Sequence, residues 1–192
     1  SRAEAEQVVR ENGKPVYGGT PADGAVIEAI QRLKRSGMDV MYYPFILMEQ
    51  LAGNGRADPY SDAPDQAVLP WRGRITTSIA PGRAGSPDGT AAAEDEVAAF
   101  FGAARASDFE IVSGDARPPK GPDLPDPLNL IMGVEPPEWR PIVYSGPQEW
   151  GYRRFILHQA ALCKAAGGVE SFCIGSEMRG LTQIRGRNNS FP

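Results

Sequence analysis

Apolar residues recur at helical spacing in three stretches of the chain, and a short apolar run follows each stretch. The first stretch opens with Thr20-Pro21-Ala22-Asp23, which is typical of a helix start in which Thr20 is the capping residue. Gly37 is typical of the left-handed residue that ends a helix. Residues 38–43 then predict a short buried strand that stops at Pro44. The apolar face of this helix carries Val26, Ile27, Ile30 and Leu33.

The same order of helix and strand occurs twice more. A second helix is predicted from Ser86-Pro87-Asp88 to about Ala106, with a strand at residues 108–113. A third helix opens at Ser145-Gly146-Pro147 and closes at Gly167-Gly168, and a strand at residues 169–174 follows it. The residues expected to face inward are Val97, Phe100, Phe101 and Ala104 in the second helix and Tyr152, Phe155, Ile156, Leu162 and Cys163 in the third.

Helices that alternate with short apolar strands indicate an α/β fold of βαβ units with parallel strands. We favour a partial (β/α)8 TIM-barrel-like fold over an open sheet. No Gly-x-Gly-x-x-Gly fingerprint follows a strand, and Gly53-Asn54-Gly55 has no helix after it, so no nucleotide cofactor is predicted. A full barrel takes about 250 residues. This chain of 192 residues therefore predicts an arc of about four to five strands, whose open edges need cover from neighbouring segments or another copy.

One long segment has little periodicity. Half of the 18 prolines lie between Pro118 and Pro147. We interpret this segment as a long excursion from one edge of the sheet, and two alternatives remain open for it. It is either a functional or mobile loop, or an arm that docks a partner.

Composition narrows the class of protein. The chain is 41% hydrophobic and 23% charged, with a formal net charge of -4, which argues against a nucleic-acid partner. It has no run of 18 apolar residues, so no membrane span is expected. It begins without a signal peptide or an initiating Met, so we expect it to be cut from a longer protein.

Cys163 and Cys173 lie in apolar patterns without metal-site spacing, and both are predicted to be buried free thiols.

The run Phe172-Cys173-Ile174-Gly175-Ser176-Glu177 is the strongest candidate for chemistry, because an apolar strand ends there, one small turn later, in a carboxylate. In a parallel α/β barrel the catalytic groups lie at such strand ends. The structural alternative is an ion pair between Glu177 and a neighbouring cation such as Arg179 or Arg185.

Other residues also have alternative interpretations. Trp71 either stacks on a sugar face while Arg72 and Arg74 bond its hydroxyls, or it packs as a core plug beside Pro70. The residues assigned to packing rather than chemistry are Trp150, Tyr152 and the single histidine, His158. Three aspartates, Asp58, Asp62 and Asp65, do not have EF-hand spacing, so a solvated turn is expected there and no metal site is predicted.

Four motifs together carry a family resemblance: Tyr17-Gly18-Gly19-Thr20-Pro21, Tyr43-Pro44-Phe45-Ile46-Leu47-Met48, Pro70-Trp71-Arg72-Gly73-Arg74-Ile75-Thr76, and Ile174-Gly175-Ser176-Glu177-Met178-Arg179-Gly180-Leu181. They resemble the TIM-barrel-like domain of gene transfer agent and phage tail hub (baseplate) proteins. More distantly, the chain is similar to clan A glycoside hydrolases of the endo-mannanase type.

This resemblance implies a role for Glu177 as general acid/base, with Ser176 where the clan often has Asn or Thr. Retaining hydrolysis also needs a second carboxylate about 5 Å away, and the resemblance places that nucleophile beyond Pro192. The clan's Lys-Pro-His pattern is replaced here by Tyr43-Pro44-Phe45, with Tyr43 as the substrate-binding candidate. We therefore expect residues 1–192 to form a single segment of a glycoside-hydrolase-like TIM barrel, truncated at both ends, with residues 114–147 as the proline-rich excursion.

The function implied is that of a module in a hub or baseplate protein that docks on a cell-surface polysaccharide. The substrate-binding candidates are Trp71, Arg72, Arg74 and Tyr43, and Glu177 is the catalytic candidate. The other expected partners are tail or baseplate proteins, and no cofactor is predicted. The expected location is the tail of a virion-like particle that is made in the bacterial cytoplasm and acts at the host cell surface. The alternative is a retaining endo-glycosidase that cleaves the polysaccharide, of which this segment alone is expected to be inactive.

Overall fold

The computed structural model describes residues 9–12, 14–16, 20–50, 52–112 and 142–192. These residues form two compact units, each assembled from two stretches of the chain. Unit 1 comprises residues 1–42 and 103–172, and unit 2 comprises residues 43–102 and 173–192. The motif Tyr17-Gly18-Gly19 lies outside the described residues.

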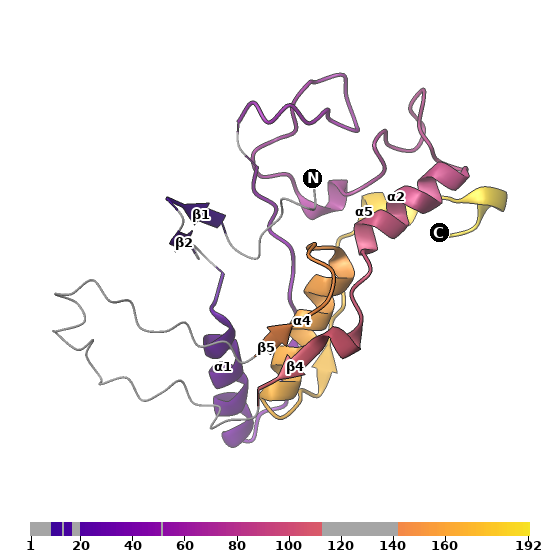
Figure 1. Ribbon diagram of the computed structural model, residues 1–192. Helices are drawn as coiled ribbons and strands as arrows, with labels where there is room; N and C mark the ends of the chain where they lie inside the picture. The colour runs from indigo at the N-terminus through magenta and orange to yellow at the C-terminus, as the bar shows by residue number, and fades with distance from the viewer. Residues whose placement is uncertain (1–8, 13, 17–19, 51, 113–141) are drawn as a thin grey trace. The chain divides into compact units, whose positions relative to one another are not determined.

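Unit 1 contains two long helices, α1 (Asp23–Arg35) and α4 (Tyr152–Ala165) (Figure 1). Both helices end in glycine, as the sequence predicted. Gly37 has a φ of 74°, its N–H donates to the carbonyl of Lys34, and the next N–H donates to the carbonyl of Leu33. Gly167 and Gly168 end α4 with the same pair of bonds, which satisfies carbonyls that would otherwise lack a partner.

The predicted helix starts are wrong. The helix α1 is capped by Ala22 without a side-chain bond, so Thr20 is not the cap. The helix α4 starts at Tyr152 rather than near Ser145, because the residues before it are held in turns. Arg154 lies over the rings of Tyr144 and Trp150, and its Cζ is 3.9 Å from each ring centroid. These contacts hold the residues that precede α4.

The strands of unit 1 form three short pairs. β3 (Met41–Tyr42) pairs in parallel with β6 (Ser171–Phe172), which confirms short strands in the runs after the first and third helices and a parallel pairing. By contrast, β4 (Phe109–Ile111) pairs antiparallel with β5 (Ile142–Tyr144), beside α4 (Figure 1). β1 (Val9–Glu11) and β2 (Lys14–Val16) also form an antiparallel pair.

The structure therefore has mixed helices and strands with one parallel pair, and the described residues do not show a closed barrel. The sequence analysis missed β5 because this strand is short and lies within the proline-rich segment. Most of residues 114–147 lies outside the described residues, and the single-segment domain assignment stays a prediction.

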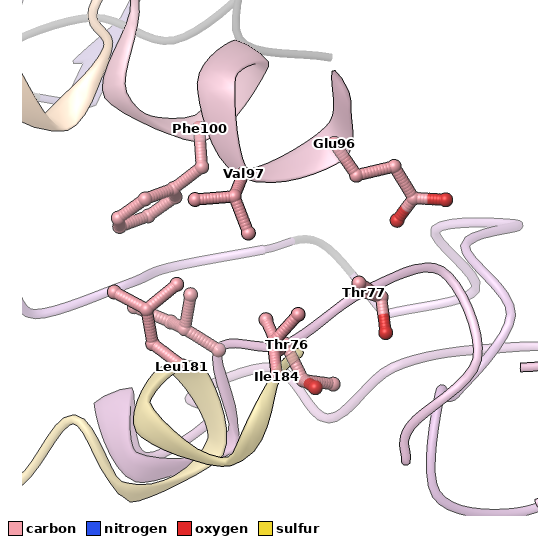
Figure 2. Close-up of a pocket in the computed structure, with 8 residues that line it drawn as sticks. Thr76, Thr77, Glu96, Val97, Phe100, Leu181 and Ile184 are labelled. Carbon is pink, nitrogen blue, oxygen red and sulfur yellow. The ribbon is translucent and has the colours of Figure 1, made fainter. Parts of the chain in front are cut away.

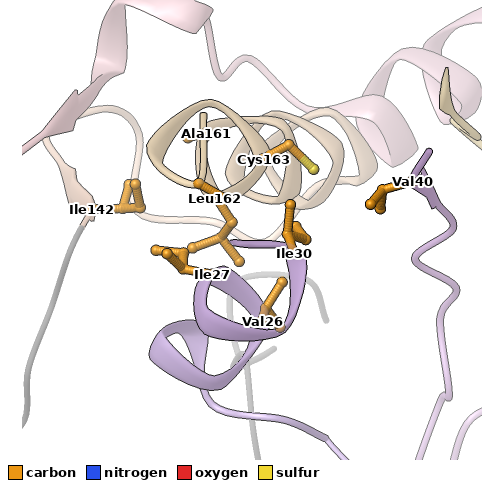
Figure 3. Close-up of a cluster of buried hydrophobic side chains, with 9 residues drawn as sticks. Val26, Ile27, Ile30, Val40, Ile142, Ala161, Leu162 and Cys163 are labelled. Atoms are coloured by element: carbon orange, nitrogen blue, oxygen red, sulfur yellow. The ribbon is translucent and has the colours of Figure 1, made fainter. Parts of the chain in front are cut away.

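The core of unit 1 lies between α1 and α4. Figure 3 shows Ile27 and Ile30 of α1 pointing toward Leu162 of α4, and Leu162 and Ile27 are almost fully buried. Cys163 is a buried free cysteine, as predicted, and burial raises the pKa of its thiol to about 11. Cys173, in unit 2, is also free but only half-buried, so the prediction was wrong about its burial.

A charged side chain, Lys34, joins the last turn of α1 to the end of α4. Lys34 Nζ donates to the carbonyl of Gly168 (3.0 Å) and to Glu170 Oε1 (3.1 Å). The other oxygen of Glu170 accepts from the N–H of Val40 (2.7 Å). The Val40 N–H and the Lys34 ammonium lower the pKa of the Glu170 carboxyl.

Unit 2 contains α2 (Ala91–Phe101), α5 (Arg179–Gln183) and two 3-10 turns, η2 (Arg72–Arg74) and η4 (Arg187–Asn189). A third 3-10 turn, η3 (Ala106–Asp108), precedes β4 in unit 1. The Thr90 hydroxyl caps α2, and Gly102, with a φ of 75°, ends it before the predicted Ala106. The small core of unit 2 consists of Ala93, Val97 and Ile184, with Phe101 and Leu181 packed against it. No helix in the described part of the chain is long and apolar enough to cross a membrane.

We predict that Glu170→Gln lowers the stability of the fold at about pH 7, and that this difference disappears toward about pH 3. The pKa of Glu170 lies below its usual value of 4.5 in the folded protein. Such a group stabilises the fold above its unfolded pKa, and the contribution is lost as the pH falls through the folded pKa. Urea unfolding followed by circular dichroism over this pH range measures the effect.

The matched control is Glu28→Gln, which removes an exposed carboxylate paired with Arg32 on the surface of α1. Exposed pairs of this kind contribute little, so the control should change stability less at every pH. Equal losses in both variants would contradict the role assigned to Glu170.

Candidate functional site

Three of the predicted site residues meet in unit 2. The indole N–H of Trp71 donates to Glu177 Oε2 at 3.0 Å, and Arg72 Nη2 lies 2.7 Å from the same oxygen. The side chain of Glu177 remains 55% exposed, whereas that of Arg72 is only 15% exposed. The result is a carboxylate held at the surface by two donors from one short turn.

The backbone of Glu177 is unusual. Its φ is 55°, in the left-handed region. Among the described non-glycine residues, the others with positive φ are Asn12, Asn188 and Asn189, a residue type that tolerates this region. For a glutamate the conformation costs about 1–2 kcal/mol. Such strain persists where surrounding contacts hold it, and it concentrates at functional sites.

Arg72 is held from several sides. Its Nε donates to the carbonyl of Ser176 (3.2 Å), and its guanidinium lies over the ring of Phe45 at 4.6 Å. The ring of Phe45 in turn lies 5.8 Å from that of Tyr43. Tyr43 therefore joins the cluster through Phe45. We call Tyr43, Phe45, Trp71, Arg72 and Glu177 the Glu177 cluster.

Phe45 and Ser176 were not predicted as members of the site. Both stand inside motifs that the sequence analysis quoted, next to Tyr43 and Glu177. Their positions in those motifs were the available signal. Which side chain would lie under the Arg72 guanidinium could not be read from the motifs, because the two segments are far apart in the sequence.

Trp71 is 50% exposed, so the alternative in which it packs as a core plug is wrong. Its ring covers Gly73, where an added Cβ would lie 2.4 Å from the indole. At Gly180, on α5, an added Cβ would lie 2.5 Å from the carbonyl oxygen of Ile75 and 2.6 Å from the hydroxyl of Tyr60. These two glycines allow η2 and α5 to approach closely and so bring Trp71 near Glu177.

Arg74 is not brought into the Glu177 cluster. Its Nη2 contacts both carboxylate oxygens of Asp58, at 2.7 and 2.8 Å, and its guanidinium lies over the ring of Tyr60. The Tyr60 N–H, and then the charge of Arg74, lower the pKa of the Asp58 carboxyl. Arg74 thus fixes the turn that carries Arg72.

The alternative interpretation of Glu177, in which it forms an ion pair, is correct, but the predicted partners are wrong. The cation that meets Glu177 is Arg72, and not Arg179 or Arg185. Arg185 instead donates to the carbonyls of Thr182 and Ile184. Because Arg72 is remote in sequence, the sequence analysis named only neighbouring arginines as examples of a partner.

The three aspartates of the preceding loop have separate partners. Asp58 binds Arg74, Asp62 pairs with Arg83, and Asp65 accepts from the N–H of Gly55 at 2.6 Å. A search of the described residues found no group of three His, Cys, Asp or Glu side chains that could hold a metal ion.

The residues assigned to packing lie in unit 1. His158 is buried, and its Nε2 lies 3.1 Å from Asp23, which joins α4 to the first turn of α1. Trp150 contacts the edge of the His158 ring, with 5.9 Å between the centroids, and Tyr152 stacks on Phe155. These contacts confirm the packing interpretation.

Two cavities of unit 2 are lined by other residues. One, between α2 and α5, has a volume of about 10 Å³ and is lined by Val97, Phe100, Leu181 and Ile184 among others (Figure 2). That volume holds one water at most. The other, of about 360 Å³, lies between residues 57–64 and 78–84. Neither cavity is lined by a member of the Glu177 cluster.

Comparison with protein families supports the resemblance found in the sequence. A family model described as the GTA TIM-barrel-like domain, where GTA stands for gene transfer agent, matches the last part of the chain. Residues 150–192 match the GTA TIM-barrel-like domain. This matched segment includes α4, β6, α5 and Glu177. The match supports the interpretation of the chain as a module related to gene transfer agents. Searches of curated proteins and of solved structures found no match to this chain.

Two substitutions of Glu177 test the strain at this position. Both Glu177→Gly and Glu177→Ala remove the carboxylate and its contacts, but only glycine adopts a positive φ without a Cβ penalty. We expect the glycine variant to be the more stable by about 1 kcal/mol in urea unfolding. As a control, Thr182 on α5 should show the opposite order, with alanine more stable than glycine. The same order at both positions would remove the evidence for strain.

Gly180→Ala tests the close approach of α5 to η2. Alanine normally favours a helix over glycine by about 1 kcal/mol, but here its Cβ meets backbone oxygen. We expect a destabilisation of about 1–3 kcal/mol by urea unfolding. The exposed neighbour Thr182→Ala should stay within about 0.5 kcal/mol of the natural sequence. A stabilised Gly180→Ala variant would show that the contact is not tight.

Proposed function

We propose that this chain is a module of a hub or baseplate protein in a phage-tail-like or gene transfer agent particle, and that unit 2 docks on a cell-surface polysaccharide. The family match over residues 150–192 supports the relation to such particles. The Glu177 cluster supports the docking role. Other tail or baseplate proteins are its proposed partners in the particle.

The single observation behind the docking role is the exposed indole of Trp71 next to a fixed carboxylate and guanidinium. A sugar ring has an apolar face of C–H groups and an edge of hydroxyls. Trp71, Phe45 and Tyr43 are 50%, 57% and 38% exposed and offer apolar surface for the face. Glu177 offers acceptors and Arg72 offers donors for the hydroxyls.

Tyr43 belongs to this surface through its contact with Phe45. Arg74 is included as a supporting residue, because Asp58 holds it away from the carboxylate of Glu177. The rigid turn matters for affinity, since groups already fixed before binding lose little freedom when the ligand arrives.

The alternative is retaining hydrolysis with Glu177 as general acid/base. That reaction needs a protonated carboxyl that gives its proton to the leaving oxygen, and a second carboxylate about 5 Å away. In the structure Glu177 Oε2 accepts a hydrogen bond from Trp71 and forms an ion pair with Arg72, which is the arrangement of an acceptor. This geometry favours docking over catalysis.

We predict that Trp71→Ala lowers binding to immobilised polysaccharide about tenfold, because the exposed ring provides the largest contact area of the cluster. The measurement is binding of the chain to an array of bacterial envelope polysaccharides. Leu69→Ala removes an apolar side chain of similar exposure two residues away and should leave binding within about twofold.

Equal losses in the two variants would indicate nonspecific apolar adhesion and contradict the proposal. If docking is the function, incubation of the chain with the same polysaccharides should produce no new reducing ends. Release that Glu177→Gln abolishes would instead establish the hydrolytic alternative.

A further inference from the structure

We propose that Glu177 sets the charge selectivity of the docking surface: by neutralising Arg72, it prevents the site from selecting anionic polysaccharides. This inference rests on the proposed docking function and adds to it a specificity role for one carboxylate. It follows from the ion pair at the centre of the cluster.

The position of Arg72 does not depend on Glu177 alone. Its Nε donates to the carbonyl of Ser176, Nη2 reaches the Ser176 hydroxyl at 3.5 Å, and its guanidinium lies over Phe45. With 15% of its side chain exposed, Arg72 is fixed at the edge of the surface. Removing the charge of Glu177 should therefore leave the guanidinium in place and change only the local field.

The charge balance of the cluster depends on that one carboxylate. Arg72 is the only cation among the five cluster residues, and Glu177 the only anion. The next arginine along the chain, Arg74, is already neutralised by Asp58 at 2.7 Å. With Glu177 charged, the Arg72–Glu177 pair therefore adds no net charge beside the aromatic rings of the cluster.

An unpaired arginine beside exposed aromatic rings would attract carboxylate groups of a uronic acid polymer, because guanidinium binds carboxylate in a two-point geometry. Because Arg72 is paired with Glu177, its guanidinium is not free to bind a carboxylate of the ligand. Specificity of this type arises from an element that acts against the wrong ligand, rather than from added contacts to the right one.

The test compares binding of the natural chain and of Glu177→Gln to a neutral polymer, galactomannan or dextran, and to an anionic one, polygalacturonate. Glutamine keeps the shape and an acceptor oxygen but removes the charge. We expect the natural chain to bind a neutral polymer and not polygalacturonate. We expect Glu177→Gln to gain binding to polygalacturonate by about three- to tenfold, and to lose that gain at about 1 M salt, where charges are screened beyond about 3 Å.

The matched control is Glu94→Gln. Glu94 pairs with Arg187 at 2.8 Å in the same unit, so this variant changes the net charge equally and also releases one arginine. It should gain no binding to polygalacturonate. An equal gain in Glu94→Gln would show a general charge effect and overturn the inference.

The double variant Arg72→Gln/Glu177→Gln should lose the gain, because no guanidinium remains beside the rings. If Glu177→Gln gains nothing, or if the natural chain already binds polygalacturonate as well as the neutral polymers, the inference fails and the docking function stands. If the natural chain binds none of these polymers, the docking function fails and the inference fails with it.

Discussion

One carboxylate oxygen, Glu177 Oε2, meets both an indole N–H and a guanidinium, and these two contacts hold the Glu177 cluster together. Trp71 and Arg72 both meet Glu177 Oε2, although more than a hundred residues separate them from Glu177 in the sequence. The contact requires a left-handed backbone at Glu177 and two glycines, Gly73 and Gly180, at which a side chain would collide with neighbouring atoms. These features have the same consequence: a glutamate that is strained, half exposed and fixed in direction. Strain of this kind is retained when the neighbouring contacts compensate for it.

Unit 1 uses similar residue types for a different purpose. His158 and Asp23, which would be suited to proton transfer in an open cleft, here join α4 to α1 beside a buried core. Arg154 is enclosed between Tyr144 and Trp150, where burial lowers its pKa. Residue type alone therefore does not identify a site. What distinguishes Glu177 is that its polar groups stay at the surface beside exposed aromatic rings.

The Glu177 cluster is a surface, and this shapes what it can do. Neither described cavity of unit 2 includes its residues. A surface with fixed donors, acceptors and rings is suited to a long polymer that lies across it, whereas hydrolysis calls for an enclosed site with two carboxyl groups. In the proposed docking function the ion pair makes recognition sensitive to charge, because Arg72 would otherwise present a positive group beside the rings.

From local patterns the sequence determined the helices that end at Gly37 and Gly167 and the short strands that follow them, and it placed Trp71 and Glu177 among the candidates. Each depends on periodicity, a glycine that accepts positive φ, or a short motif, and all of these are readable within a few residues. Only the tertiary structure decided that Arg72 rather than Arg179 meets Glu177, that Arg74 turns to Asp58, and that Phe45 supports the guanidinium. Such choices depend on which distant segments come together, and the packing of the chain, rather than any local pattern, sets that.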